Sequence, residues 1–571
     1  MRSSLRPRSA PRLYILALSL SVIGACTTLT PLTVDTRATA PVIDGFGATT
    51  LLPSQANEPA HRLFAQGMAQ VYAFNPGEAI RAFKAALAQD PECGMCAWAI
   101  AHQMGPNINN PTRGDLKMAM QYVDYAVKHS KGVSPRDMAL IESLALRYGH
   151  SAGSTLAPPG GGDICRTASS TTRPADPLDI AYAQQMRVLT SRFPADPDIL
   201  SMYAEAEMVA TRGDWWNPAT GKPIGLIGEL ATMLEAGLAR HPDHVGLNHY
   251  MIHAVDAVPV AARAIAAADR LGSLAPKSPH LLHMPSHTYA HLGRYADATR
   301  VNQLAVAADE AMMEQLKQQK FSITRDWRGH NSHFQWYGAL MEGRGDLALE
   351  TARAAAGRAR SDHAYSEYVR SLPMLTLLHM QRWEQVLKEP MPTGGKGIAA
   401  VLGEMARGIA MARLGQSAEA RATLARLEPQ VKTLVARSGG KDYMDRMALA
   451  FATSARDQLG AEIAFAEQRV DEALKLQAQA VAATAVVDSS EPPMLASGPR
   501  LRLGSMQLRA KRFAQAEQVF RTDLALHPKS GWALQGLGKA LAAQNKQAEA
   551  KNAERDMAAS WVLADAQLRT Q

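Results

Sequence analysis

The chain has 571 residues, which is too long for one compact core and indicates several domains or a repeat array. Hydrophobic residues make up 47% and aromatic residues only 6%, a balance that favours helix packed on helix and argues against a β-sandwich. The formal charge is +8, and half of it comes from four arginines in the first twelve residues. The remaining charge is small and forms no basic run, so nucleic acid is not expected as a partner.

Residues 1–25 have the layout of an export signal. The four arginines precede the apolar run LYILALSLSVIGA, which is shorter than an ordinary transmembrane span. The run ends in Ile23-Gly-Ala-Cys26, which resembles the lipobox of bacterial lipoproteins, and this resemblance implies lipidation of Cys26. Thr27 follows, and the absence of Asp there implies a bacterial cell-envelope protein anchored in the outer membrane and facing the periplasm. A plain signal peptide that leaves Cys26 free is the alternative.

Residues 26–57 lack a helical period and are expected to be a tether, whereas residues 58–571 are periodic. Small residues alternate with large ones where two helices would touch, and a proline follows the second helix. The spacing resembles tetratricopeptide (TPR) repeats and is seen at Gly67, Ala79, Phe83, Ala86 and Pro91, and again at Gly504, Ala516, Phe520 and Pro528. The resemblance implies an all-α solenoid of roughly eight to ten helical hairpins, with a concave groove for a protein or peptide partner.

Two stretches interrupt the period and are expected to be loop insertions. Residues 150–177 are rich in Gly, Pro, Ser and Thr, and residues 213–226 contain Trp215 and Trp216 within a turn-rich segment. The tryptophans are expected to anchor the loop or to cover the site beside it.

Cys93 and Cys96 form a CxxC pair at the start of a predicted helix. Such a pair can be a local disulfide, a redox pair or half of a metal site. Export favours the disulfide, because exported proteins fold in an oxidising compartment.

Ten of the 17 histidines lie between His241 and His333, so residues 241–337 form a histidine-rich central part. Residues three or four apart share one face of a helix, and the repeat alignment turns that face toward the groove in three consecutive repeats. His280 lies on the same face. The candidate metal ligands are three pairs: His249 and His253, His283 and His287, and His330 and His333.

Neutral imidazoles favour Cu, Zn or Fe over Mg or Ca, which prefer oxygen ligands. Metal binding is then expected to weaken near pH 6.5, where an unperturbed histidine takes up a proton. Pro285 interrupts the helix between His283 and His287 and is expected to kink or restart it. Two other interpretations stay open: a groove that binds a peptide or small ligand, and a structural polar core.

Several segments resemble those of a bacterial group of exported TPR proteins. The shared patterns are CxxC…GPNIN, NHYxIHAxD, HMPSHxYxxxGRY and HNxHFxW, found here at Cys93–Asn109, Asn248–Asp256, His283–Tyr295 and His330–Trp336. The group implies this architecture and these site candidates, but no reaction, so whether the chain is an enzyme stays open. Here His291 adds a further candidate ligand. The expected function is an envelope binding scaffold, and the alternative is a metal-binding protein or a metal-dependent oxidoreductase.

Overall fold

The computed structural model describes residues 31–110, 114–149, 176–211, 215–217, 220–393, 397–440 and 442–569. Within these ranges the chain is helical, apart from loops and one isolated bridge between Trp216 and Pro223. No helix in these ranges combines the length and hydrophobicity needed to cross a membrane. The predicted signal peptide, Cys26 and residues 150–175 of the first predicted loop lie outside the described residues.

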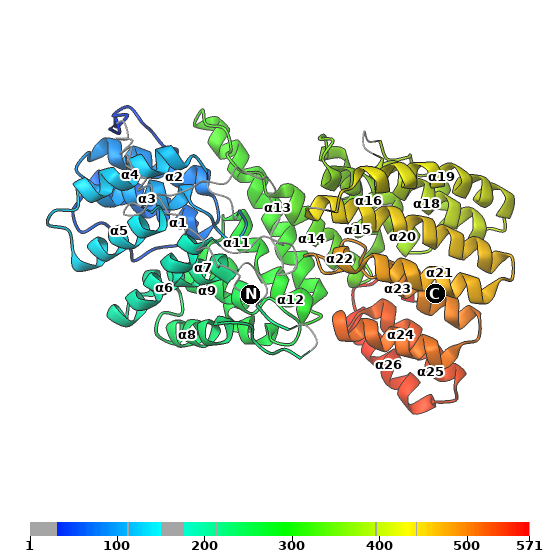
Figure 1. The fold of residues 1–571 in the computed structure, drawn as a ribbon. Helices are drawn as coiled ribbons and strands as arrows, with labels where there is room; N and C mark the ends of the chain where they lie inside the picture. The colour runs from blue at the N-terminus through cyan, green and yellow to red at the C-terminus, as the bar shows by residue number, and fades with distance from the viewer. Residues whose placement is uncertain are drawn as a thin grey trace, which may run out of the picture.

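The predicted α-solenoid of TPR-type hairpins is confirmed: successive helices pack against each other and stack along the molecule (Figure 1). The first part of the stack consists of α1 (Glu58–Tyr72), α2 (Pro76–Gln89), α3 (Gly94–Met104), α4 (Leu116–Lys128), α5 (Pro135–Arg147), α6 (Pro177–Arg192), α7 (Pro197–Thr211) and α8 (Ile227–Arg240). The central part consists of α9 (Val245–Ala254), the short helix η1 (Ala261–Ala264), α10 (Ile265–Leu274), α11 (Pro279–His283), α12 (Pro285–His291), α13 (Tyr295–Gln318) and α14 (Arg328–Met341).

The last part of the stack begins after the histidine-rich region. It consists of α15 (Gly345–Arg358), α16 (Ala364–His379), α17 (Trp383–Lys388), α18 (Ile398–Arg413), α19 (Ser417–Arg437), α20 (Tyr443–Ala466), α21 (Val470–Ala483), α22 (Ala485–Asp488), α23 (Gly498–Arg509), α24 (Phe513–Leu526), α25 (Gly531–Ala543), α26 (Gln547–Ser560) and α27 (Ala566–Arg569). The buried apolar residues form two large clusters, one from Ile43 to Trp327 and one from Tyr295 to Leu568. They adjoin at α13 and α14, beside the histidines.

The packing inside the hairpins explains the repeat spacing. A Cβ atom on Gly67 would lie 2.4 Å from the ring of Phe83, so only glycine lets α1 and α2 approach this closely. Phe520 fills the same role for two glycines, because added Cβ atoms on Gly504 and Gly536 would lie 2.5 Å and 2.3 Å from its ring. The large residue of one helix therefore fits where its neighbours have no side chain.

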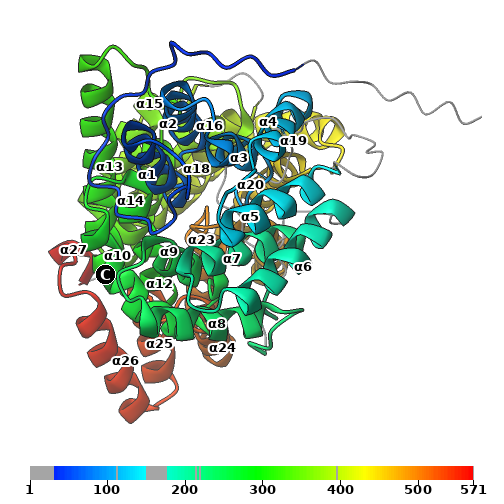
Figure 2. The ribbon, with the colours of Figure 1, turned by 90° about the vertical axis from the view of Figure 1, so that its left-hand side faces the viewer.

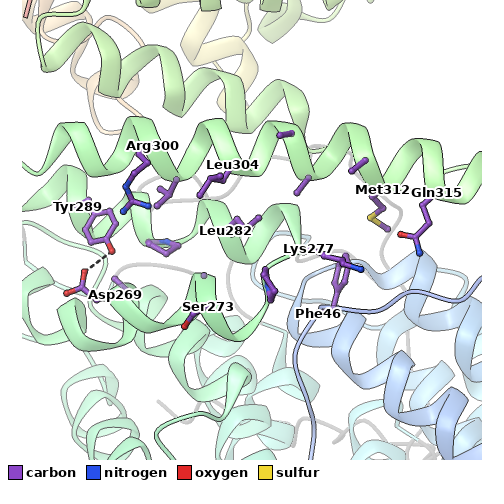
Figure 3. A pocket seen from close by; sticks show the side chains of 18 residues that line it. Phe46, Asp269, Ser273, Lys277, Leu282, Tyr289, Arg300, Leu304, Met312 and Gln315 are labelled. Atoms are coloured by element: carbon purple, nitrogen blue, oxygen red, sulfur yellow. Dashed lines mark hydrogen bonds between the residues drawn. The ribbon is translucent and has the colours of Figure 1, made fainter. Parts of the chain in front are cut away.

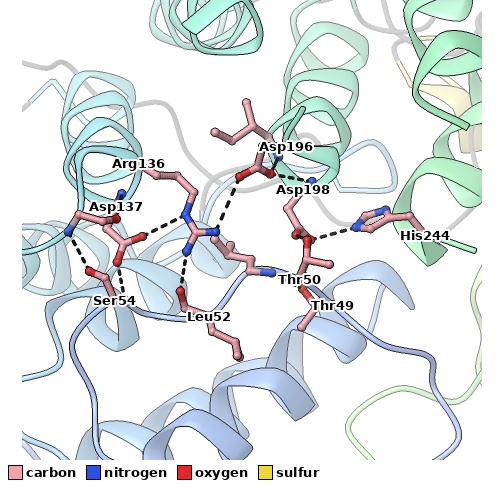
Figure 4. A network of polar contacts seen from close by, with 12 residues as sticks. Thr49, Thr50, Leu52, Ser54, Arg136, Asp137, Asp196, Asp198 and His244 are labelled. Atoms are coloured by element: carbon pink, nitrogen blue, oxygen red, sulfur yellow. Dashed lines mark hydrogen bonds and ion pairs between the residues drawn. The ribbon is translucent and has the colours of Figure 1, made fainter. Parts of the chain in front are cut away.

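The segment expected to be a tether is helix-free over its described residues 31–57, but part of it is firmly packed. Residues 41–55, which we call the strap, run across α5, α7 and α9 (Figure 4). Thr49 and Thr50 donate hydrogen bonds to Asp198, which also contacts Nε2 of His244 at 3.1 Å. Ser54 N donates to Asp137 at 2.7 Å. The strap therefore belongs to the folded body and ties the first hairpins to the central ones.

The C-terminal hairpins fold back onto the middle of the chain instead of ending freely (Figure 2). The indole N–H of Trp532 donates to the carbonyl of Leu340 at 2.8 Å, and that of Trp561 donates to the carbonyl of Met341 at 3.0 Å. The two indole rings pack edge to face, with centroids 4.9 Å apart. These contacts join α25–α27 to the end of α14, about 200 residues earlier, so the stack closes on itself.

Candidate functional site

Four helices carry the central histidines. α9 carries His249 and His253, α11 carries His280 and His283, α12 carries His287, and α14 carries His330. As predicted, Pro285 interrupts the helix, since α11 ends at His283 and α12 begins at Pro285. The two short helices nevertheless continue in nearly the same direction, because Met284 between them has helical backbone angles. His280, His283 and His287 therefore stay on one side.

The six histidines form two groups of three. In the first trio, Nε2 of His249 lies 3.1 Å from Nε2 of His253 and 3.2 Å from Nε2 of His280. In the second trio, Nε2 of His283 lies 3.0 Å from Nε2 of His287 and 3.1 Å from Nε2 of His330. Each trio presents three nitrogens within 4.8 Å of one another.

The two trios adjoin each other. The ring centroids of His280 and His283 are 6.0 Å apart, and those of His253 and His287 are 6.3 Å apart. Five of the six histidines are buried, and His330 is partly exposed. This corrects one aspect of the sequence analysis, because the histidines lie inside the molecule and do not line an open groove.

Hydrogen bonds on the far ring nitrogens fix the direction of two lone pairs. Nδ1 of His249 lies 2.7 Å from the carbonyl of Tyr72, which can only accept, so Nδ1 carries the proton. Nδ1 of His283 lies 2.7 Å from Oδ1 of Asn302, whose amide nitrogen donates to Ala298 at 2.8 Å. In both rings Nε2 is therefore unprotonated and directs its lone pair into its trio.

His287 has the same orientation for a different reason. Its Nδ1 lies 3.0 Å from Oδ2 of Asp256 and 2.8 Å from Oε2 of Glu491. A carboxylate accepts, so this nitrogen also carries a proton, and Nε2 is the atom that His287 directs into the trio. In the second trio the lone pair of His283 consequently faces Nε2 of His287 at 3.0 Å. A cation between these two nitrogens, either a proton or a metal ion, would hold them at this distance.

Burial keeps five of the six trio imidazoles neutral. It lowers the pKa of His249, His280, His283 and His330 well below the usual value, and neighbouring histidines lower it further. Burial also lowers the pKa of His253 to about 3. Aromatic rings supply much of this environment: Trp327 stacks on His280 at 4.2 Å, and Phe334 packs against His283 at 4.6 Å. A neutral imidazole is the form that binds a metal.

A third cluster flanks the second trio. Nε2 of His291 lies 3.0 Å from Oδ1 of Asp256 and 3.7 Å from Oε1 of Glu491. Burial opposes the charge on His291, but its contacts with Asp256 and Glu491 raise its pKa to about 9. Burial also opposes ionisation of Asp256, yet contacts with His287 and His291 hold its pKa well below the usual value. Burial raises the pKa of Glu491, as does the nearby charge of Asp256.

The structure brings together five of the six predicted metal-ligand candidates and leaves His333 apart. Nε2 of His333 lies 2.8 Å from the hydroxyl of Tyr368, and Nδ1 lies 3.0 Å from that of Tyr365. The sixth member of the two trios is His280, which belongs to the first trio, and not His333. The sequence placed His280 on the correct face but did not include it among the candidates. No sequence signal pointed to Asn302 or Glu491.

Cys93 and Cys96 form a disulfide at the start of α3. The nearby His102 stacks on Trp98, with ring centroids 5.3 Å apart, and its Nδ1 contacts Gln103 at 3.0 Å. Both contacts lie within α3. Of the tryptophans in the second predicted loop, Trp216 is buried and donates to the carbonyl of Ala254 at the end of α9 at 2.7 Å.

A separate cavity of about 690 Å³ lies between α10 and α13, with part of the strap at one end (Figure 3). Leu282 and Tyr289 face it from α11 and α12, and Tyr289 donates to Asp269 at 2.7 Å. His283 and His287 lie on the other side of the same helices. The cavity is therefore distinct from the histidine trios.

Comparison with known proteins gives few similarities. No protein family and no curated protein matches the sequence. Among solved structures, the human IFIT1 dimer with m7Gppp-AAAA is 10% identical, with 90% of this chain and 96% of that chain covered and a TM-score of 0.30. A monomeric mutant of IFIT1 with Gppp-AAAA is also 10% identical, with 81% of this chain and 90% of that chain covered and a TM-score of 0.31. Both likenesses concern the helical fold.

Proposed function

We propose that this protein binds two transition-metal ions side by side, one in each histidine trio. The observation that supports this most strongly is the convergence of three buried or partly buried imidazole nitrogens in each trio, with Nε2 of His283 and Nε2 of His287 only 3.0 Å apart. A metal ion between Nε2 of His283 and Nε2 of His287 would take both nitrogens as ligands. The second ring nitrogens are already held by Tyr72, Asn302 and carboxylates, an arrangement typical of histidines that bind metals.

Copper fits the two trios best. Their ligands are all imidazoles, which suit Cu, Zn, Fe and Ni and do not suit Mg or Ca. Neither trio contains a carboxylate, in contrast to the di-iron sites of helical bundles. Two buried divalent ions would bring four positive charges among neutral ligands, whereas two Cu(I) ions would bring only two. Since burying charge is costly, the monovalent pair is favoured.

Three protein ligands leave room for a further ligand on each ion. Catalytic metal sites often have this open coordination, whereas structural zinc sites are usually closed by four protein ligands. A metal-dependent oxidoreductase therefore fits the centre better than a purely structural role. The expected protein or peptide partner would have to bind another part of the concave surface, because the histidines are buried.

Metal content tests this proposal. Untagged protein dialysed against Cu(I) under reducing, anaerobic conditions is expected to retain two ions per chain by elemental analysis. His253→Ala and His330→Ala are each expected to retain one, because each removes a ligand from a different trio. His241→Ala at the end of α8 is the matched control and is expected to retain two. If the wild type retains no copper, zinc or iron, the trios are a polar core.

We further propose that the protein is exported and held at the outer membrane by a lipid on Cys26, facing the periplasm. The support is the leader and the segment Ile23-Gly-Ala-Cys26. Labelled palmitate fed to expressing bacteria is expected to enter the wild type and not Cys26→Ser. Cys165→Ser is the matched control and should be labelled like the wild type. Equal labelling of Cys26→Ser and the wild type would contradict the anchor.

A further inference from the structure

Beside the second trio, four side chains from three separate parts of the chain meet. Asp256 follows α9, His287 and His291 belong to α12, and Glu491 lies between α22 and α23. Asp256, His291 and Glu491 place one ligand atom each within 4.8 Å of one another. The side chains of Asp256 and Glu491 are only 7% and 9% exposed. Two carboxyl groups are thus withdrawn from water in one place.

The hydrogen-bond donors in this cluster are too few for its acceptors. Nδ1 of His287 carries one proton, yet oxygens of Asp256 and Glu491 approach it at 3.0 Å and 2.8 Å. Nε2 of His291 donates to Asp256. Oε1 of Glu491 is buried, and Nε2 of His291 approaches it only to 3.7 Å, which is longer than a hydrogen bond. A buried carboxylate oxygen without a donor at hydrogen-bond distance costs free energy, and a cation in the cluster would remove that cost.

We propose that Asp256, His291 and Glu491 form a third cation site, in addition to the two ions proposed above and resting on that proposal. Two carboxylates and one or two imidazoles form a harder, more negatively charged ligand set than the trios. This set suits a divalent ion such as Zn²⁺. The two kinds of site therefore have different metal preferences.

His287 would link the third site to the second trio. Its Nε2 lies in the trio, and its Nδ1 lies between the two carboxylates. When a third ion binds Nδ1, the proton on that nitrogen leaves to solvent, and the ring then bonds one ion through each nitrogen. The third ion would also fasten the segment around Glu491 to α12, which is 204 residues earlier at His287.

Zinc binding by the full-length protein tests this inference, because Zn²⁺ suits both the trios and the carboxylate cluster. The wild type dialysed against Zn²⁺ is expected to hold three ions, and Glu491→Gln is expected to hold two. His291→Asn, at a partly exposed position, is a second variant and is also expected to hold two. Glu472→Gln on the exposed side of α21 is the matched control and should hold three. Melting followed by circular dichroism checks that each variant is folded.

Hydrogen exchange gives an independent readout. Zinc is expected to slow exchange in residues 489–497 of the wild type and not in Glu491→Gln. If the wild type and both variants all hold two ions, the third site is wrong and the two-ion proposal stands. If the wild type holds one ion that both variants lose, the two-ion proposal is wrong. If no protein holds zinc, the third site is wrong, and the copper content of the wild type decides the two-ion proposal.

Discussion

Metal-free protein is expected to lose stability steeply between pH 6.5 and pH 5.5. Burial lowers the pKa of five trio histidines, so the folded chain keeps them neutral, whereas the unfolded chain protonates them below about 6.5. The unfolded state then binds more protons, and the free energy of unfolding falls as pH falls. Over this one pH unit the loss is about 1 kcal/mol for each histidine, or about 5 kcal/mol in all.

A loss of this size is comparable to the whole stability of many domains, about 5–15 kcal/mol. The measurement is urea unfolding of chelator-treated protein at pH 7.5, 6.5 and 5.5. His253→Gln should flatten the pH dependence, because it removes one of the groups that titrates on unfolding. His363→Gln is the matched control and should leave the pH dependence unchanged, since it lies outside the trios at the start of α16. An unfolding midpoint that stays constant from pH 7.5 to 5.5 would contradict this account.

The same burial changes the expected pH dependence of metal binding. From the sequence, binding should weaken near pH 6.5, where an ordinary histidine is protonated. In the folded protein His253 has a pKa of about 3, and other trio histidines are also lowered. Metal and proton therefore compete in the folded state only at more acidic pH.

Removing residues 529–571 is expected to loosen the histidine centre as well as the C-terminus. In a solenoid with only nearest-neighbour contacts, such a deletion destabilises the array from one end and leaves the middle folded. Here Trp532 and Trp561 are buried against the end of α14, the helix that carries His330. The truncated chain should therefore exchange amide hydrogens faster along α14 and α15 than the full chain does.

A point substitution separates the loss of the contact between the C-terminal helices and α14 from the other effects of truncation. Trp561→Ala is expected to cost about 3–5 kcal/mol, the usual range for a buried tryptophan. It should speed exchange in α14, because the carbonyl of Met341 loses its donor. Val562→Ala is the matched control, since this neighbour is 66% exposed. Unchanged exchange in α14 after Trp561→Ala would support nearest-neighbour behaviour.

The sequence predicted the fold well where local spacing determines it. Gly67 with Phe83, and Gly504 with Phe520, are set by contacts inside one hairpin, which a short sequence window contains. The packing of Trp561 against the end of α14 was not predicted. It depends on how the small rotations between successive repeats add up along the stack. Local periodicity does not determine that sum.

The sequence also predicted only part of the candidate site. Helical spacing placed His249 with His253 and His283 with His287 correctly. Whether His280 or His333 completes the set depends on how each helix is rotated against its neighbours, and the repeat alignment did not resolve this. Glu491 could not be found at all, because it lies in a loop that reaches the site only through the curvature of the stack.

Closure of the stack also fixes an order of assembly during synthesis. The last trio histidine is residue 330, whereas the tryptophans that seal the end of α14 are residues 532 and 561. A chain made from its N-terminus therefore possesses all six trio imidazoles roughly 200 residues before Trp532 and Trp561 can pack against the end of α14. We expect ions to enter most rapidly in that interval, so protein refolded in the presence of copper should load faster than native metal-free protein given the same copper.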